Sequence, residues 1–252
     1  MGSMAAVARG LEDRFRVLEP WQRRSGGEPL TVARHAADLH EVVQVYCSGQ
    51  RPAIVGHSWG AMLALAYTAA HPESVGLLVL AGCGTFDPEA RARMKANRAA
   101  RMDGDMLARM ARIEQEIVDP DERLCALGRL FMLVDSYDLA WTEASLEACE
   151  AAANRETWDD MLHLQEVGVY PAAFSAIRTP VLMVHGAHDP HPGEMIRASL
   201  APYLRQLEYN EWSRCGHYPW LERVVGDEFF EVVGGWLAQQ LAGPADEHRM
   251  EQ

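Results

Sequence analysis

The pentapeptide GHSWG at residues 56–60 constrains the fold of this chain more than any other feature. It has the pattern G-x-S-x-G, and it lies between an apolar segment at 52–55 and a run of small residues at 61–70. This motif makes a sharp, strained turn when a strand precedes it and a helix follows, and the turn exposes the serine hydroxyl. The two glycines make room where a Cβ would clash. We therefore predict that Ser58 is a nucleophile above the carboxyl ends of a parallel sheet.

The backbone N–H of Trp59 is the candidate donor to an oxyanion. It opens the predicted helix after Ser58, where the positive end of the helix dipole lies. The alternative is a chance occurrence of the pattern in a chain with 20 glycines. The strand before the motif and the helix after it favour the functional interpretation.

His217 is the candidate base, because an isolated serine hydroxyl is a poor nucleophile and needs one. It lies in the loop CGHYPW at 215–220, between a strand candidate at 207–211 and the last predicted helix at 221–241. From such a loop a histidine can reach over the sheet edge to a serine on another loop. The alternative is a histidine that caps a helix or lies on the surface.

Asp189 is the candidate acid that orients His217. It follows the apolar run VLMVH at 181–185, which we predict to be a strand, so its carboxylate lies at the same sheet edge as Ser58. The alternative is an aspartate that forms a turn before Pro190.

A metal site is the rival interpretation of the same segment, because three histidines crowd around the acid. They would need a specific loop to converge, and their spacing is not the helical H-x-x-x-H of zinc sites. We therefore predict no metal and no cofactor. The crowded residues are His185, His188, Asp189 and His191.

The order of apolar runs predicts an α/β fold with a mostly parallel sheet that helices cover on both faces. The candidates at 52–55, 75–80 and 181–185 are mainly apolar, which is typical of strands buried on both faces, and helical segments alternate with the candidates; 207–211 is a weaker strand candidate. Thr31 is the predicted N-cap of one helix. The predicted strands lie at 15–18, 52–55, 75–80, 181–185 and 207–211.

The segment from Thr85 to about Tyr170 contains no strand candidate and is rich in helix formers. We predict that this segment, 85–170, is a helical cap over Ser58. It divides the core into a first part at 1–84 and a second part at 171–242. The polar tail at 243–252 is predicted to be frayed.

Charge, hydropathy and cysteine content exclude several classes of protein. The net charge of −13 over 252 residues would repel the phosphates of nucleic acid. No segment approaches the roughly 18 apolar residues of a membrane helix, and no secretory signal is visible. The five cysteines are odd in number and show no CxxC spacing, so we predict no disulfide framework, no zinc ribbon and a reducing cytoplasm. The expected partner is a small-molecule substrate, and the oligomeric state is left open.

Three motifs together resemble the α/β-hydrolase superfamily: GHSWG, VLMVHGAHD at 181–189 and GHYPWLE at 216–222. The order Ser58, Asp189, His217 is that family's order of nucleophile, acid and base. The helical insertion after VGLLVLAGCGTFDP resembles the cap of proline iminopeptidase-like members. The resemblance covers about 15–241 and implies a serine hydrolase with a catalytic triad.

The resemblance also implies a substrate pocket beneath the cap. Cap helices form the pocket in such enzymes, so Trp59, Phe86 and Trp158 are the residues expected to line it. An equally fair interpretation is that these side chains only hold the cap to the core.

The chain departs from the family pattern before Ser58. Family members carry a His-Gly loop after their third strand, which supplies a second oxyanion N–H, and no His-Gly pair precedes Ser58 here. The segment 20–27 resembles the family's later loop, so the run FRVL at 15–18 stands where the fourth strand is expected. Residues 1–11 are too few, and too rich in alanine and glycine, for three strands.

We therefore expect an N-terminally shortened chain. Its sheet has either an unfilled slot beside 52–55 or the segment 15–18 in that slot, because unpaired buried backbone groups cost about 1–3 kcal/mol each. Such a chain is expected to be less stable, or to associate through strand edges. Its oxyanion hole keeps the Trp59 N–H alone, and the loss of one donor costs about 10²–10³ in rate.

Two functions of different classes follow from these residues. The first is hydrolysis of a small ester or amide through an acyl-enzyme on Ser58. The second is a non-catalytic or truncated member that binds a ligand under its cap. A lyase or a cofactor-free peroxidase with the same triad is a related alternative, because fold does not determine reaction.

Overall fold

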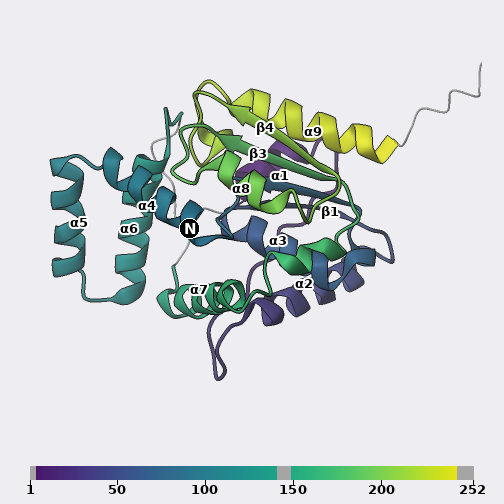
Figure 1. The fold of residues 1–252 in the computed structure, drawn as a ribbon, viewed down its shortest axis with the longest axis horizontal. Coiled ribbons are helices and arrows are strands. Elements are labelled where there is room, and N and C mark those ends of the chain that lie inside the picture. The colour runs from purple at the N-terminus through teal and green to yellow at the C-terminus, as the bar shows by residue number, and fades with distance from the viewer. Residues whose placement is uncertain (1–3, 141–148, 243–252) are drawn as a thin grey trace, which may run out of the picture.

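A four-stranded parallel sheet forms the centre of the structure, a computed structural model that describes residues 4–140 and 149–242. Every residue of the two inner strands is buried, which explains why their sequences are mainly apolar. The α/β fold class predicted from the apolar runs is confirmed. In spatial order the strands are β1 (Ala53–His57), β2 (Leu77–Ala81), β3 (Val181–Gly186) and β4 (Leu207–Trp212) (Figure 1).

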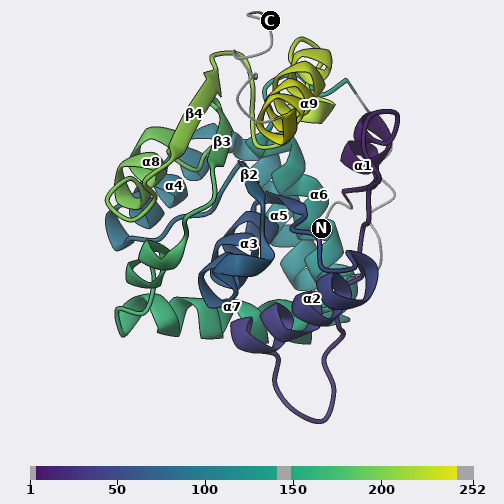
Figure 2. The same ribbon diagram turned by 90° about the vertical axis from the view of Figure 1, so that its right-hand side faces the viewer.

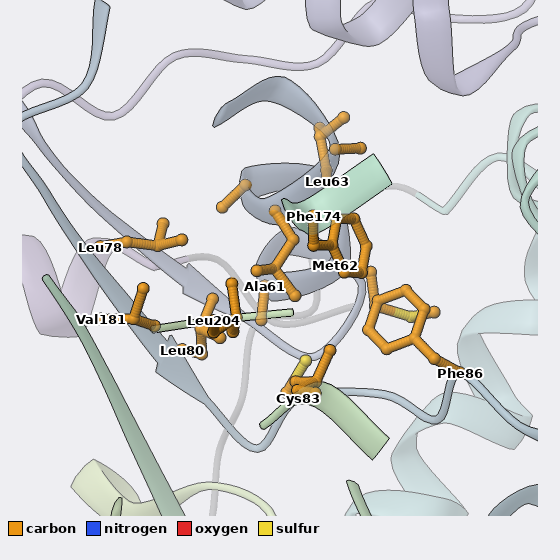
Figure 3. Packing of buried hydrophobic residues seen from close by; sticks show 14 of the residues in the cluster. Ala61, Met62, Leu63, Leu78, Leu80, Cys83, Phe86, Phe174, Val181 and Leu204 are labelled. Carbon is orange, nitrogen blue, oxygen red and sulfur yellow. The ribbon is translucent and has the colours of Figure 1, made fainter. Parts of the chain in front are cut away.

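Helices cover both faces of the sheet. Successive residues of a strand point to opposite faces, so the side chains of β2 divide between two clusters. Leu78 and Leu80 pack with α3 and α8 (Figure 3), whereas Leu77 and Val79 pack with α1 and α9, which lie side by side (Figure 2). Helix α2 also belongs to the core. The five core helices are α1 (Ala5–Leu11), α2 (Val32–Tyr46), α3 (Trp59–Ala70), α8 (Gly193–Leu200) and α9 (Gly226–Ala242).

The predicted strand at 15–18 is wrong. These residues pair with no strand, and β1 is an edge of the described sheet. Phe15 and Val17 instead pack, partly buried, against the cluster on the α9 face. A run of four residues is too short to show a periodic pattern. It therefore cannot distinguish a strand from an irregular segment that packs on the core.

Four helices make up the described part of the predicted cap. Aspartates begin three of them, because Asp87, Asp103 and Asp119 each accept a backbone N–H of the first turn. No described residue between 85 and 170 belongs to a strand, and α5 and α6 project away from the sheet (Figure 1). The four helices are α4 (Pro88–Arg101), α5 (Gly104–Glu116), α6 (Pro120–Asp135) and α7 (Ala151–Glu166).

The boundaries of the predicted cap and core parts stay a prediction. Residues 141–148 of the predicted cap and the predicted tail at 243–252 lie outside the described residues.

Hydrogen bonds from the chain before α2 attach α7 to the core. Glu156 accepts the Ser25 hydroxyl at 2.8 Å and the Leu30 backbone N–H at 2.9 Å. Asp160 accepts the N–H of Val32, the first residue of α2, at 2.7 Å. The carboxylates of one cap helix thus satisfy backbone donors of the core. Thr31 caps α2 as predicted, since its side chain accepts the N–H of Arg34.

A disulfide joins Cys125 of α6 to Cys149, with 5.5 Å between the Cα atoms. Beside it, the Ala151 N–H at the start of α7 donates to Asp121 at 2.8 Å. The cysteine spacing predicted no disulfide framework, and it gave no indication of this single disulfide. Spacing along the chain could not show it, because the cap helices bring together residues 24 positions apart.

Removal of this disulfide is expected to lower thermal stability. A cross-link over a loop of this length contributes about 3 kcal/mol by restricting the unfolded chain. At about 2–4 °C per kcal/mol, the Tm should fall by roughly 10 °C when a reductant is added. Scanning calorimetry checks this, with the double variant Cys125→Ala/Cys149→Ala as the control. That variant should melt at the lower temperature with and without reductant, and a reductant-dependent Tm in it would contradict the assignment.

Candidate active site

Ser58 lies at the turn between β1 and α3 with a strained backbone. Its φ of 52° and ψ of −115° place a non-glycine residue in the positive-φ region, which costs free energy and is held by its surroundings. The Ser58 N–H donates to the carbonyl of Ala81, the last residue of β2, at 3.0 Å. The serine is therefore anchored between the carboxyl ends of two neighbouring strands.

The glycines of the motif have different roles. A Cβ on Gly56 would lie 2.3 Å from the carbonyl oxygen of Gly60, so position 56 accepts only glycine. A Cβ on Gly60 would meet nothing within 4 Å outside its own helix. The prediction that both glycines make room is therefore right for Gly56 and wrong for Gly60.

Asp189 and His217 form a buried hydrogen-bonded pair. The Nδ1 of His217 lies 2.6 Å from Oδ2 of Asp189, and the two residues are 4% and 3% exposed. Asp189 belongs to the loop that leaves β3, and His217 belongs to the loop that leaves β4. Because both strands are parallel to β1, the two loops emerge at the same sheet edge as Ser58.

His217 lies close to the turn that holds Ser58. A Cβ on Gly82, the residue after Ala81, would lie 3.1 Å from Nδ1 of His217. Gly82 has a φ of +50°, so glycine serves this position both by its backbone and by the space it leaves for the imidazole. Among the described residues no hydrogen bond joins the Ser58 hydroxyl to His217, and catalytic hydrogen bonds often tighten only with substrate.

Two backbone contacts hold the main chain of His217. Its N–H donates to the carbonyl of Asp135 at 2.8 Å, at the end of α6. Its carbonyl accepts Nε2–H of His57 at 2.9 Å. Asp135 is itself held by a two-point ion pair with Arg98, at 2.9 and 2.5 Å. Helix α6, in the segment predicted to form a cap, therefore contributes directly to the position of the candidate base.

His57 is neutral in this environment. Burial lowers its pKa well below the ordinary value, and the neighbouring His217 lowers it further. Its ring lies 4.6 Å from that of His217 and 4.7 Å, edge to face, from Trp220. A neutral imidazole carries one N–H, and the contact with the His217 carbonyl places it on Nε2.

Asp189 accepts hydrogen bonds on both carboxylate oxygens. Oδ1 accepts the backbone N–H of His191 at 2.8 Å and its Nδ1–H at 2.8 Å, and Nε2 of His185 lies 3.2 Å from Oδ2. Burial alone would raise the pKa of Asp189, but the neighbouring histidines, His217 first, outweigh it and hold the pKa well below its ordinary value. Asp189 is therefore an anion that is well supplied with donors.

The same residues are the candidate metal ligands among the described part of the chain. Asp189, His191 and His217 place one ligand atom each within 4.8 Å of one another. The two Nδ1 atoms, however, lie 2.8 and 2.6 Å from the carboxylate, which are hydrogen-bond lengths. A metal would need the lone pairs of both nitrogens at about 2.0–2.1 Å. Hydrogen bonds fit this geometry better than a metal ion does.

The predicted pocket residues have different environments. The Trp59 and Trp158 rings meet edge to face at 5.9 Å, and Trp158 is 40% exposed. Phe86 is 3% exposed and packs edge to face on Phe174 in the core (Figure 3). Trp59 and Trp158 therefore contact each other, whereas Phe86 is buried in the core.

Sequence reasoning missed several residues of this site. The sequence indicates His191 only as a ligand of the alternative metal site. It indicates His57 only as a variable position of the G-x-S-x-G motif. No sequence feature indicates the role of Asp135, because its contact with His217 uses a backbone carbonyl and joins residues 82 positions apart. Only His57 could have been found from its place within the motif.

The sequence model of the alpha/beta hydrolase family matches residues 3–231. The chain belongs to this family. The resemblance inferred from the three motifs is thereby confirmed, and hydrolase activity is supported.

This alpha/beta hydrolase chain is similar to one curated relative in sequence and to two solved structures in fold. The 2-hydroxymuconate semialdehyde hydrolase of Pseudomonas sp. (strain CF600) is 24% identical over 208 residues, which cover 81% of this chain and 67% of the relative. A solved structure of VinJ matches with a TM-score of 0.65 at 17% sequence identity. The match covers 94% of this chain and 85% of the VinJ chain. A solved structure of the proline iminopeptidase of Mycobacterium smegmatis matches with a TM-score of 0.52 at 15% sequence identity. The match covers 84% of this chain and 73% of the iminopeptidase chain.

This alpha/beta hydrolase spans 63–67% of the length of the curated relatives that it matches.

Proposed function

We propose that this chain is a serine hydrolase that cleaves a small ester or amide through an acyl-enzyme on Ser58. The observation that carries the proposal is the strained Ser58 turn at the same sheet edge as the buried Asp189–His217 pair. A nucleophile, a base and an acid that orients the base are the groups that acyl transfer needs.

The proposed reaction has two halves. His217 takes the proton of the Ser58 hydroxyl as its oxygen attacks the substrate carbonyl, and then gives this proton to the leaving group. Water, activated by the same imidazole, releases the acyl group. Asp189 keeps the imidazole in the tautomer with its proton on Nδ1 and stabilises the imidazolium. The Trp59 N–H, at the N-terminus of α3, donates to the oxyanion.

Trp59 and Trp158 are the proposed walls of the substrate site. Trp59 directly follows Ser58 in the chain, and its ring meets that of Trp158 edge to face. Aromatic rings that are only partly buried are suited to bind a small acyl or amine group. The name of one relative, a proline iminopeptidase, supports an amide as well as an ester. We do not extend this proposal to Phe86, because it is buried in the core.

A fluorophosphonate probe tests the proposed nucleophile. The intact chain should be labelled at Ser58 alone, because only an activated serine attacks phosphorus rapidly. Mass spectrometry of the labelled peptide identifies the site. Labelling of a different residue would refute Ser58 as the nucleophile, and the absence of labelling would favour the ligand-binding alternative.

A panel of short acyl esters and aminoacyl amides then tests the substrate class. Hydrolysis of one series identifies the leaving group that the site accepts. Dialysis against a chelator serves as the control, and it should leave turnover unchanged because the proposed reaction uses no metal.

The proposed partners are small molecules. No described helix has the length and hydropathy needed to span a bilayer. The cytoplasm stays a prediction, and the Cys125–Cys149 disulfide counts against it because disulfides persist in oxidising compartments.

A further inference from the structure

Asp189 carries a second imidazole that the proposed mechanism does not use. Nδ1 of His191 lies 2.8 Å from Oδ1 of Asp189, while Nδ1 of His217 lies 2.6 Å from Oδ2. The His191 and His217 rings are stacked, with centroids 4.6 Å apart and planes 20° apart. One carboxylate thus bridges two parallel imidazoles, one on each oxygen.

We propose that His191 is a positioning residue, which fixes the carboxylate of Asp189 and the ring plane of His217 through this bridge. The proposal rests on the proposed function, in which Asp189 orients the base.

The side chain of His191 is separable from its backbone. The backbone N–H of His191 also donates to Oδ1, and any residue except proline would keep that bond. The additional donor is Nδ1–H, and only a histidine, or an amide in the same place, supplies it. A substitution at 191 therefore removes the imidazole while it leaves the turn at Pro190 intact.

The hydrogen-bond pattern defines the protonation of His191. Burial lowers its pKa, and the Asp189 charge and hydrogen bond only partly oppose this. The neutral ring therefore keeps its single proton on Nδ1, where it faces the carboxylate. Oδ1 is then held by two donors of one residue, so the carboxylate cannot rotate away from His217.

The side chain of His191 is largely buried beside the proposed acid. It is 11% exposed and lines a cavity of about 280 Å³ together with Asp189, Arg93 and Asn97. Ser58, Trp59 and Trp158 are not among the described residues that line this cavity.

Charges from several elements face the bridge and would influence its pH dependence. Arg98 lowers the pKa of His191, and the Asp189 charge acts on Arg101 and on His57. His185 contacts Asp189, and Glu194 and Glu211 line the cavity. Substitutions at 191 leave all of these in place, so a change in the pH profile reports the bridge itself.

Two variants separate the donor from the ring. His191→Phe keeps a planar ring for stacking but has no donor. His191→Asn loses the ring, but its side-chain N–H₂ can stand where Nδ1–H stands. We expect kcat to fall about tenfold in His191→Phe with little change in KM, because the lost bond is to a charged group that never touches substrate. His191→Asn should recover most of this loss.

The pH profile of kcat/KM gives a readout that a purely structural role would not move. Without the Nδ1–H donor of His191, hydrogen bonds offset less of the negative charge on the Asp189 carboxylate. The carboxylate then stabilises the protonated form of His217 more strongly. The midpoint of the acid limb should therefore move to higher pH by about half a unit in His191→Phe. In His191→Asn it should return toward the original value.

Equal losses in both variants with an unmoved acid limb would overturn the proposal, and so would unchanged kinetics in His191→Phe. Thermal denaturation of both proteins shows whether a loss of activity reflects unfolding.

Proton NMR tests the bridge without any turnover. In the full chain carrying Ser58→Ala, we expect low-field imidazole N–H signals from His217 and His191, in addition to those of the other hydrogen-bonded histidines, His57 and His185. Adding His191→Phe should remove the His191 signal and shift that of His217. A low-field spectrum that this substitution leaves unchanged would refute the bridge. If the unmodified chain shows neither labelling nor turnover, the proposed function fails, and this spectrum still decides the role of His191.

Discussion

Replacement of Ser58 by alanine is expected to lower kcat by about 10⁴–10⁶ and to abolish fluorophosphonate labelling. The loss is large because the hydroxyl is the only group in the proposed site that forms a covalent bond with substrate. The fold should be retained, because the backbone bond from Ser58 to Ala81 does not involve the side chain. Steady-state kinetics with the best ester of the panel measures the effect.

Ser199→Ala is the matched control for this experiment. The Ser199 hydroxyl donates to the Ile196 carbonyl within its own helix, α8, away from the acid–base pair. Its removal makes the same chemical change and should leave both labelling and kcat within about twofold, as is usual for substitutions outside special sites. Turnover retained in Ser58→Ala would eliminate the proposed nucleophile.

Replacement of Asp189 by asparagine is expected to lower kcat by about 10⁴. The amide has one acceptor oxygen instead of two, so it cannot accept both Nδ1–H of His217 and the two donors of His191. An amide N–H₂ that faces His217 would also stabilise the wrong tautomer, with the lone pair on Nδ1. Kinetics over a range of pH measures the loss, which should persist at high pH because deprotonation cannot restore the carboxylate.

Asp135→Asn is the matched control for the acid. Asp135 is also buried, at 2% exposure, but its side chain pairs with Arg98 and only its backbone carbonyl contacts His217. This variant should lose stability, because it leaves Arg98 without its ionic partner. Its kcat should fall much less than that of Asp189→Asn. Equal losses of kcat in the two variants would show that burial of an acid, rather than orientation of the base, explains the effect.

Much of the fold could be predicted from local pattern. The strands at 75–80, 181–185 and 207–211 appear in the structure within two residues of the predicted bounds. The first two are inner strands that are buried on both faces and therefore mainly apolar, whereas 207–211 is an edge strand with a mixed sequence. The N-cap at Thr31 and the turn at Ser58 also follow from short motifs. Each of these features is determined by residues that are neighbours in the chain.

The failures have a common cause, which is dependence on distant residues. The run at 15–18 would become a strand only with a partner, and the described sheet provides none. Phe86 is apolar whether it lines a pocket or packs in the core, and only the position of Phe174 decides this.

The sequence alone determined that a strained serine turn, an aspartate after one strand and a histidine after another occupy one edge of a parallel sheet. Short-range sterics and hydrogen bonding are enough for this, because parallel strands bring the loops at their carboxyl ends together. Only the tertiary structure decided how the base is held: by the Asp135 carbonyl from α6, by His57 beneath it and by the bridge of Asp189 to His191. These contacts use backbone atoms or precise ring orientations, which residue type and spacing do not encode.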